Sequence, residues 1–302
     1  MKHTASNDLP IIEALLLISP QSSKNTLRSW IKEGRVQVDG IPVLNASTLV
    51  HKDQLVTVGQ RKKMIRSDIP ILYEDQDIVV IDKPSGLLSV STVFEKGETA
   101  HALLKAHYHP RKVFVVHRLD QDTSGVIVFA LNQEANDRLK ELFKEHDIER
   151  AYTAIVEGQL SIPNGTWKSF QYEDSQYVVH ETEDETHGRL AITHFRTLTT
   201  TKRYTALELR LETGRKNQIR VHCQSVGHSI VGDKKYGAVS NPIKRLCLHA
   251  HLLAFQHPFS KKKMRFESLM PEEFKRLIAP VHKEKLERKE SPPYKEKTQK
   301  RA

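Results

Sequence analysis

Apolar side chains near the start of the chain follow two patterns, a helical one and then an alternating one. In SSKNTLRSWIKEG, Leu27 and Ile31 lie four residues apart, serine precedes the pattern as N-cap, and Gly34 follows it as a stop signal. In RVQVDGIPV, apolar residues alternate around an Asp-Gly pair, which favours a β-hairpin. A helix followed by a hairpin predicts a compact N-terminal domain over residues 10–60.

The rest of the chain is richer in strand patterns than in helical ones. RKKMIRSDIP is polar and basic, and we interpret residues 61–70 as a linker. Strands outnumber helices after it without regular alternation, which predicts an α+β domain with a mixed, mostly antiparallel sheet over residues 71–281. Residues 282–302 are rich in Lys, Glu and Pro and predict a disordered basic tail. The predicted strands are IVVI, VFVVH, VIVFAL, RAYTAIVEG, RYTALELRLE and LCLHAHLLAF, and the predicted helices are NQEANDRLKELFKEH, NQIRVHCQSVGH and PEEFKRLIAPV.

Composition narrows the class of protein. The 302 residues include 47 Lys and Arg against 37 Asp and Glu, a formal charge of +10 that favours an anionic partner such as nucleic acid. The N-terminus lacks a signal-peptide pattern and the apolar run IIEALLLIS is too short to span a bilayer, so we expect a soluble cytoplasmic protein without membrane contact. Cys223 and Cys247 form no C-x-x-C pair, and we expect reduced thiols and no metal site.

Basic residues are spaced regularly on the first predicted helix. Lys24, Arg28 and Lys32 recur every four residues and therefore share one outer face, and Arg35 follows the helix directly. The spacing alone leaves two interpretations open. The face is either a solvated helix surface or a contact for RNA phosphates.

The stretch VHRLDQDTSG places one carboxylate, Asp120, between a predicted strand and a turn. An ionised carboxylate in a cleft needs a cation or several hydrogen-bond donors. Arg118 is one candidate, and Arg220 in TGRKNQIRVH is another. A guanidinium bound to Asp120 in bidentate fashion keeps it charged and ready as a nucleophile or base, whereas a pair that only locks a loop is the structural alternative.

These stretches resemble, in order, the motifs of RNA pseudouridine synthases of the RluA type, the branch that includes RluC- and RluD-type enzymes. HRLDQDTSG resembles the signature HRLDxxTSG, and YEDQDIVVIDKPSGLL resembles the opening motif with its Lys-Pro turn. ERAYTAIVEG is similar to the strand that carries the family's tyrosine, TGRKNQIRVH to its basic motif, and IVGDKKYG and LHAHLLAFQHP to its closing motifs. The N-terminal domain resembles the alpha-L RNA-binding domain often fused ahead of these enzymes, which favours RNA contact for the basic helix face.

The resemblance implies that the chain converts uridine in RNA to pseudouridine, an isomerisation that needs neither a redox cofactor nor a nucleotide. It implies that Asp120 is the essential aspartate, that Tyr152 stacks on the uracil, and that Arg220 pairs with the aspartate. Asn217 departs from the family, which often has His there, and this departure puts a fine contact in doubt. The pairing predicts that Arg220→Ala costs activity more than stability. The predicted RNA-binding residues are Lys24, Arg28, Lys32, Arg35, Arg118, Arg215 and Lys216.

The fused RNA-binding domain favours large-subunit ribosomal RNA over transfer RNA as the substrate, and we expect a monomer. A transfer-RNA synthase is one alternative. A non-catalytic RNA-binding or ribosome assembly factor on the same fold is another, although the complete set of Asp120, Tyr152 and Arg220 argues against it. A metal-assisted nuclease or phosphotransferase requires clustered carboxylates, and the only acid close to Asp120 in sequence is Asp122.

Overall fold

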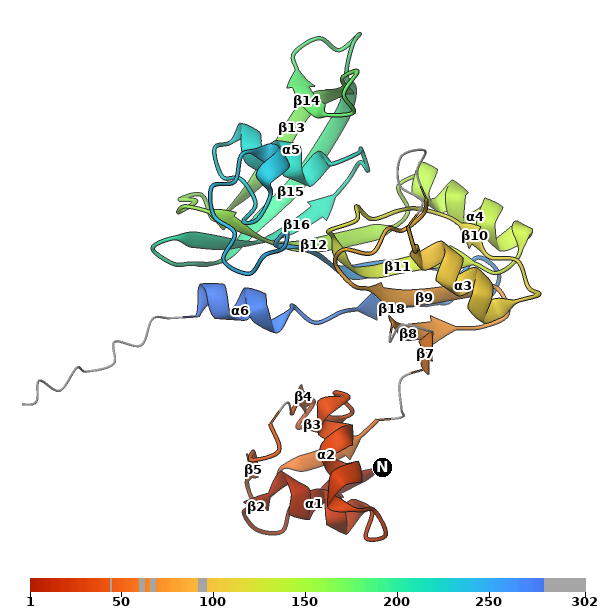
Figure 1. Ribbon diagram of the computed structural model, residues 1–302, viewed down its shortest axis with the longest axis vertical. Helices are drawn as coiled ribbons and strands as arrows, with labels where there is room; N and C mark the ends of the chain where they lie inside the picture. The colour runs from red at the N-terminus through yellow and green to blue at the C-terminus, as the bar shows by residue number, and fades with distance from the viewer. Residues whose placement is uncertain (44, 60–62, 66–68, 92–96, 280–302) are drawn as a thin grey trace, which may run out of the picture.

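The computed structural model describes residues 1–279 apart from 44, 60–62, 66–68 and 92–96. The predicted tail over 282–302 lies outside the described residues. Figure 1 shows a small N-terminal domain in red and orange, joined to a larger domain built around one long sheet. Among the described residues no helix has the length and apolarity needed to cross a bilayer.

The N-terminal domain contains the helix and the hairpin that the sequence predicts. The helix α2 (Lys24–Lys32) buries Leu27 and Ile31, and the side chain of Ser23 caps it by accepting a hydrogen bond from a backbone N–H. The hairpin turns at Asp39 and Gly40, which both have positive φ, as a type I′ turn requires. The other elements are β1 (Lys2–Thr4), β2 (Leu9–Pro10), α1 (Ile11–Ile18), β3 (Val36–Val38), β4 (Ile41–Pro42), β5 (Leu49–Val50) and β6 (Leu55–Val58), with sheet orders β1-β6-β3-β4 and β2-β5.

The predicted linker is partly wrong. Within residues 61–70, β7 (Lys63–Ile65) pairs with the start of β8 (Ile69–Glu74) in an antiparallel ladder. Ile65 and Ile69 are each 2% exposed and belong to the core of the larger domain. Burial of these apolar side chains is favourable, whereas a solvated linker would leave them exposed to water. The larger sheet therefore begins before residue 71.

The larger domain has a mixed, mostly antiparallel sheet, which confirms the predicted α+β class. Its order is β14-β13-β15-β16-β12-β17-β11-β9-β8-β7, with β10 beside β11 and β18 beside β17. Only the β11–β17 pair is parallel among the described ladders of this sheet. The strands not yet given are β9 (Ile78–Lys83), β10 (Phe114–Val115), β11 (Ser124–Ala130), β12 (Glu149–Glu157), β13 (Asn164–Glu173), β14 (Val179–Thr182), β15 (Arg189–Thr200), β16 (Tyr204–Leu211), β17 (Leu248–Gln256) and β18 (Lys263–Glu267).

Helices cover different parts of this sheet, as Figure 1 shows. The helix α4 (Gln133–Lys144) packs on β10 and β11, and α5 (Gln218–Ser225) packs on β14 and β15 at the other end. The remaining helices are α3 (Ala100–Tyr108), the 3₁₀ turn η1 (Lys234–Tyr236) and α6 (Glu272–Ile278). The start of α5 thereby comes to lie near the middle of the sheet, where β11, β12 and β17 are neighbours.

Candidate active site

Asp120 lies in the loop between β10 and β11. The predicted strand VFVVH pairs only over Phe114–Val115, so the carboxylate lies in the loop beyond the strand rather than at the strand end. A turn follows, in which the backbone N–H of Thr123 donates to the carbonyl of Asp120 at 3.1 Å. Gly125 then enters β11 with φ of +117°, and a Cβ there would lie 2.1 Å from the carbonyl oxygen of Ala250. Glycine is required because β17 approaches this point so closely.

Lys83 holds the loop of Asp120 in place through hydrogen bonds to backbone carbonyls. Its ammonium group is fully buried and donates hydrogen bonds to the carbonyls of Pro84, Leu87 and Gln121 at 3.0, 2.7 and 2.9 Å. Burial lowers the pKa of Lys83 to about 7, against the opposing effect of the two loop aspartates. The Lys-Pro turn of the opening motif is thus tied through backbone atoms to the segment that carries Asp120.

Two hydroxyl groups of the same turn complete this attachment. Ser89 donates to the carbonyl of Leu119 at 2.7 Å and accepts from its N–H at 3.0 Å. Ser85 donates to the carbonyl of Asp122 at 2.7 Å. The backbone on both sides of Asp120 is therefore fixed by hydrogen bonds, so its side chain projects in a defined direction.

Asn217 makes the shortest described contact to the carboxylate. Its Nδ2 donates to Oδ2 of Asp120 at 2.6 Å, and its Oδ1 accepts from the hydroxyl of Tyr236 at 3.2 Å. That hydroxyl also accepts from the N–H of Val179, so its proton points to Asn217 and fixes the orientation of the amide. Asn217 has φ of +53° at the start of α5, a left-handed conformation that asparagine tolerates. The position that departs from the family pattern supplies a direct donor.

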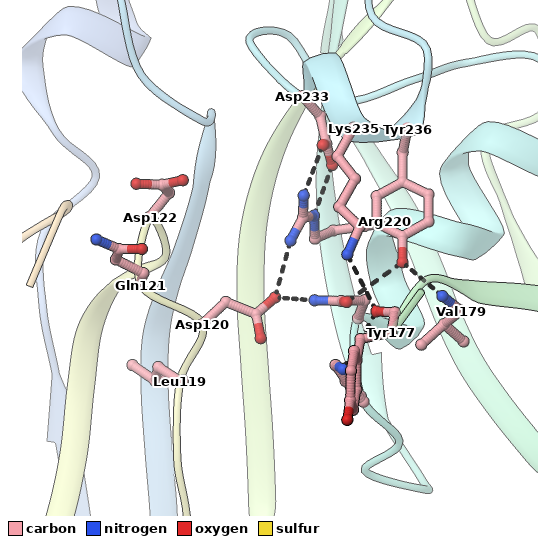
Figure 2. A network of polar contacts seen from close by, with 12 residues as sticks. Leu119, Asp120, Gln121, Asp122, Tyr177, Val179, Arg220, Asp233, Lys235 and Tyr236 are labelled. Atoms are coloured by element: carbon pink, nitrogen blue, oxygen red, sulfur yellow. Dashed lines mark hydrogen bonds and ion pairs between the residues drawn. The ribbon is translucent and has the colours of Figure 1, made fainter. Parts of the chain in front are cut away.

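Arg220 bridges two aspartates, as Figure 2 shows. Its Nε and Nη2 donate to the two oxygens of Asp233 at 2.7 Å each, and Nη1 reaches Oδ2 of Asp120 at 3.4 Å. Burial opposes its charge, but the hydrogen bonds and charge of Asp233, followed by the charge of Asp120, raise the pKa of Arg220. The predicted bidentate pair with Asp120 is therefore wrong. The bidentate partner is Asp233, whose side chain is only 1% exposed, because a buried guanidinium needs a buried counter-charge.

Tyr152 lies on β12 and lines the same cavity as Asp120. Burial raises the pKa of its hydroxyl to about 12; nearby Arg150 opposes the shift, while the charge of Asp120 adds to it. The phenol therefore stays protonated at neutral pH. The cavity is also lined by Leu211 and Leu248, so its wall combines an aromatic ring, aliphatic side chains and a carboxylate.

Arg118 and Arg215 stand at the rim of this cavity. Both line it and both are exposed. The cavity measures about 70 Å³, small beside the roughly 300–1,000 Å³ of ordinary ligand pockets. Arg118 and Arg215 are thus exposed cations beside a small cavity.

The structure places the predicted RNA-binding residues in four different environments. Arg118 and Arg215 join Asp120, Tyr152 and Arg220 at the cavity, whereas Lys216 lines a neighbouring cleft and pairs with Glu173. In the N-terminal domain Lys24, Arg28 and Lys32 are all exposed on one face of α2, which we call the basic face of α2. Arg35 differs, because its guanidinium packs over Trp30 at 4.9 Å and donates to the carbonyl of Gly59.

Sequence reasoning missed three members of this network. Asn217 was noticed only as a departure, and Asp233 and Tyr236 were noticed only as part of a closing motif. A signal for the last two exists in IVGDKKYG, where two glycines with positive φ enclose an acid and an aromatic residue three positions apart. Such spacing is typical of a tight turn that directs both side chains to one side.

Comparison with known proteins finds matches to two family models and to several relatives. Residues 77–225 match the model of the RNA pseudouridylate synthase family, and residues 14–56 match the S4 domain. An uncharacterized RNA pseudouridine synthase of Bacillus subtilis (strain 168), YhcT, is 33% identical over 276 residues, covering 87% of this chain and 91% of that protein. The ribosomal large subunit pseudouridine synthase D of Pseudomonas aeruginosa is 33% identical over 287 residues, covering 86% and 88%.

Solved structures show the same fold. Human RNA pseudouridylate synthase domain containing 4 superposes with a TM-score of 0.56 at 23% identity, covering 68% of this chain and 89% of that one. Human RNA pseudouridylate synthase domain containing 1 gives 0.55 at 24%, covering 67% and 83%. The chain matches the models of the synthase family and of the S4 domain, and its relatives align with it over most of their length. It therefore belongs to the RNA pseudouridylate synthase family and is an RNA-binding isomerase.

Proposed function

We propose that this enzyme isomerises uridines in large-subunit ribosomal RNA and that Asp120 carries the reaction. The observation behind this proposal is the position of its carboxylate, which faces the cavity, accepts from Asn217 at 2.6 Å and lies 3.4 Å from the guanidinium of Arg220. Both contacts place a hydrogen-bond donor on the carboxylate and so orient the group that we propose as nucleophile or base. With its side chain 27% exposed, the carboxylate also remains accessible to a substrate.

The reaction breaks the bond between N1 of uracil and C1′ of ribose and forms a bond between C5 and C1′. The base gives up the proton on C5 and gains one on N1, so the product has the same atoms as the substrate. The target nucleotide must leave its stack to reach Asp120. Tyr152 supplies a ring on which the extruded uracil stacks, and its hydroxyl is protonated in the free enzyme at neutral pH.

Two features support ribosomal RNA as the substrate. Several relatives that match over most of their length are named ribosomal large subunit pseudouridine synthase D. The S4 domain also presents the exposed basic face of α2, which suits the phosphate backbone of a folded RNA. We propose that this face contacts RNA outside the catalytic cavity, and that the enzyme acts in the cytoplasm as a monomer.

The test uses the purified full chain and two unmodified transcripts, large-subunit ribosomal RNA and a pool of transfer RNAs. Pseudouridine is mapped by position after incubation with the parent enzyme or with Asp120→Asn. We expect defined sites in the ribosomal transcript with the parent and none with the variant. Modification confined to transfer RNA contradicts the substrate, and equal product from Asp120→Asn contradicts the role of the carboxylate.

A further inference from the structure

A second cleft lies beside the catalytic cavity, near the turn of the β13–β14 hairpin. It measures about 400 Å³, and its lining includes Gln171, Glu173, Val179, Arg189, Arg215 and Lys216. Arg215 lines both this cleft and the catalytic cavity. Lys216 lines the cleft while its chain neighbour Asn217 lines the cavity, so the segment 215–217 forms the wall between the two spaces.

Gln171 is the unusual member of this lining. Its side chain is buried, with the residue only 4% exposed, yet neither its Nε2 nor its Oε1 has a hydrogen-bond partner among the described residues. An unpartnered buried amide is destabilising, and native proteins rarely retain one without a ligand or a water that satisfies it. The amide is therefore a position that a water molecule or a ligand with polar edges would satisfy.

Strand pairing directs this amide into the cleft. Gln171 on β13 pairs with Arg189 on β15, and Glu173 pairs with Val179 on β14. Paired residues, and residues two apart on one strand, share a face of the sheet. These four side chains consequently point to the same side, the side on which they line the cleft.

The charge of the cleft favours a phosphate. Arg189, Arg215 and Lys216 supply three cations against the single carboxylate of Glu173, which is already paired with Lys216. The guanidinium of Arg215 is anchored through Nε to the carbonyl of Leu190 at 2.9 Å, and this leaves its terminal nitrogens for another acceptor. Arg189 is exposed and makes no ion pair with any described residue.

We infer that this cleft binds the nucleotide next to the target uridine. This inference rests on the proposed function. Arg189 and Arg215 hold the phosphate, and the amide of Gln171 reads the base edge through one donor and one acceptor, the pairing that glutamine makes with nucleobases. Because the wall between cleft and cavity is a single short segment, occupation of the cleft places the adjoining nucleotide at Asp120. Gln171 is thus a specificity residue and not a catalytic one.

The test compares Gln171→Leu with Gln176→Leu, a control that makes the same change at an exposed glutamine on the same hairpin. Each full-length variant is incubated at several concentrations with unmodified large-subunit ribosomal transcript, and the rate of pseudouridine formation is followed at each site. For Gln171→Leu we expect the half-saturating concentration to rise about tenfold, with the rate at saturation within about twofold of the parent. The modified sites should also become less uniform in their neighbouring base.

Stability and charge provide independent checks. Leucine replaces an unsatisfied amide with an apolar group of similar size, so the melting temperature of Gln171→Leu should equal or exceed that of the parent. Arg189 is exposed, so the Arg189→Gln variant should fold like the parent. It should lower the salt dependence of RNA binding by about one unit of log–log slope. If Gln171→Leu behaves like Gln176→Leu and Arg189→Gln like the parent, the inference is wrong, while absence of product from the parent contradicts the proposed function instead.

Discussion

Arg220 is shared by two aspartates, and the structure predicts that they differ sharply in what their loss does. From Arg220, Asp233 accepts two hydrogen bonds of 2.7 Å and Asp120 accepts one contact of 3.4 Å. The side chain of Asp233 is 1% exposed and that of Asp120 is 27% exposed. The matched substitutions Asp233→Asn and Asp120→Asn remove one charge each with almost no change of shape. The first should mainly affect stability and the second mainly the reaction.

The magnitudes follow from burial. Removing one partner of a buried ion pair costs about 3–5 kcal/mol, and Asp233→Asn should lie near the lower end, because the new amide oxygen still accepts one hydrogen bond and Asp120 remains nearby. A partly exposed pair contributes about 0–1 kcal/mol, so Asp120→Asn should change the free energy of unfolding by no more than about 1 kcal/mol. Loss of the reactive carboxylate should nevertheless lower turnover by at least about a thousandfold.

The chain offers a clean assay for the stability part. It has two tryptophans, Trp30 in the N-terminal domain and Trp167 in the larger one, where Trp167 stacks on Phe195. In a Trp30→Phe background, fluorescence during urea unfolding reports the larger domain alone, which avoids combining two domains in one transition. Turnover is measured as tritium released from C5 of labelled uridine in ribosomal transcript. A stable Asp233→Asn or an active Asp120→Asn would refute the reasoning.

Three further predictions follow from the structure. Arg220→Ala should abolish turnover and also destabilise the larger domain by about 3–5 kcal/mol, because it leaves Asp233 buried and unpaired. The sequence alone predicts that activity suffers more than stability. An unchanged free energy of unfolding would contradict the expectation from the structure. Replacing all three cations of the basic face of α2 by alanine should lower the log–log salt slope of RNA binding by about 2–3 without changing turnover on saturating RNA, and a slope equal to that of the parent would count against RNA contact. Burial lowers the pKa of His222 to about 4. Between pH 6.5 and 4 the folded state therefore binds fewer protons than the unfolded state. The free energy of unfolding should fall on acidification through this window by up to about 1.4 kcal/mol per pH unit. Urea unfolding at pH 7 and 5 should show a smaller loss in His222→Gln, and equal losses would disprove the assignment.

Local patterns predicted the elements whose apolar faces are regular. The helices α2 and α4 and the strands β9, β12, β16 and β17 all lie where the spacing of apolar residues places them. The strands β13 and β15 were missed, because one of their faces is exposed and carries Lys, Thr, His and Arg, so their patterns read as polar segments. β10 was predicted too long, since the chain leaves the sheet after Val115 to form the loop of Asp120.

The residues of the candidate site were predicted more completely than the contacts between them. Asp120, Tyr152 and Arg220 do meet at one cavity, as the ordered motifs indicate. The division of Arg220 between two acids was not predictable, because Asp233 is brought to it by the packing of η1 against α5. Sequence spacing carries no information on which of two carboxylates a guanidinium prefers; burial decides it.

The attachment of the Asp120 loop through main-chain carbonyls has a consequence for sequence tolerance. Lys83 and Ser85 bind the carbonyl groups of Gln121 and Asp122, not their side chains, and both of these side chains point to solvent. Every amino acid presents the same backbone carbonyl, so positions 121 and 122 should tolerate substitution. Lys83 and Ser85, which donate to these carbonyls, should not. A library randomised at Gln121 and Asp122 should yield many active clones, and one randomised at Lys83 very few.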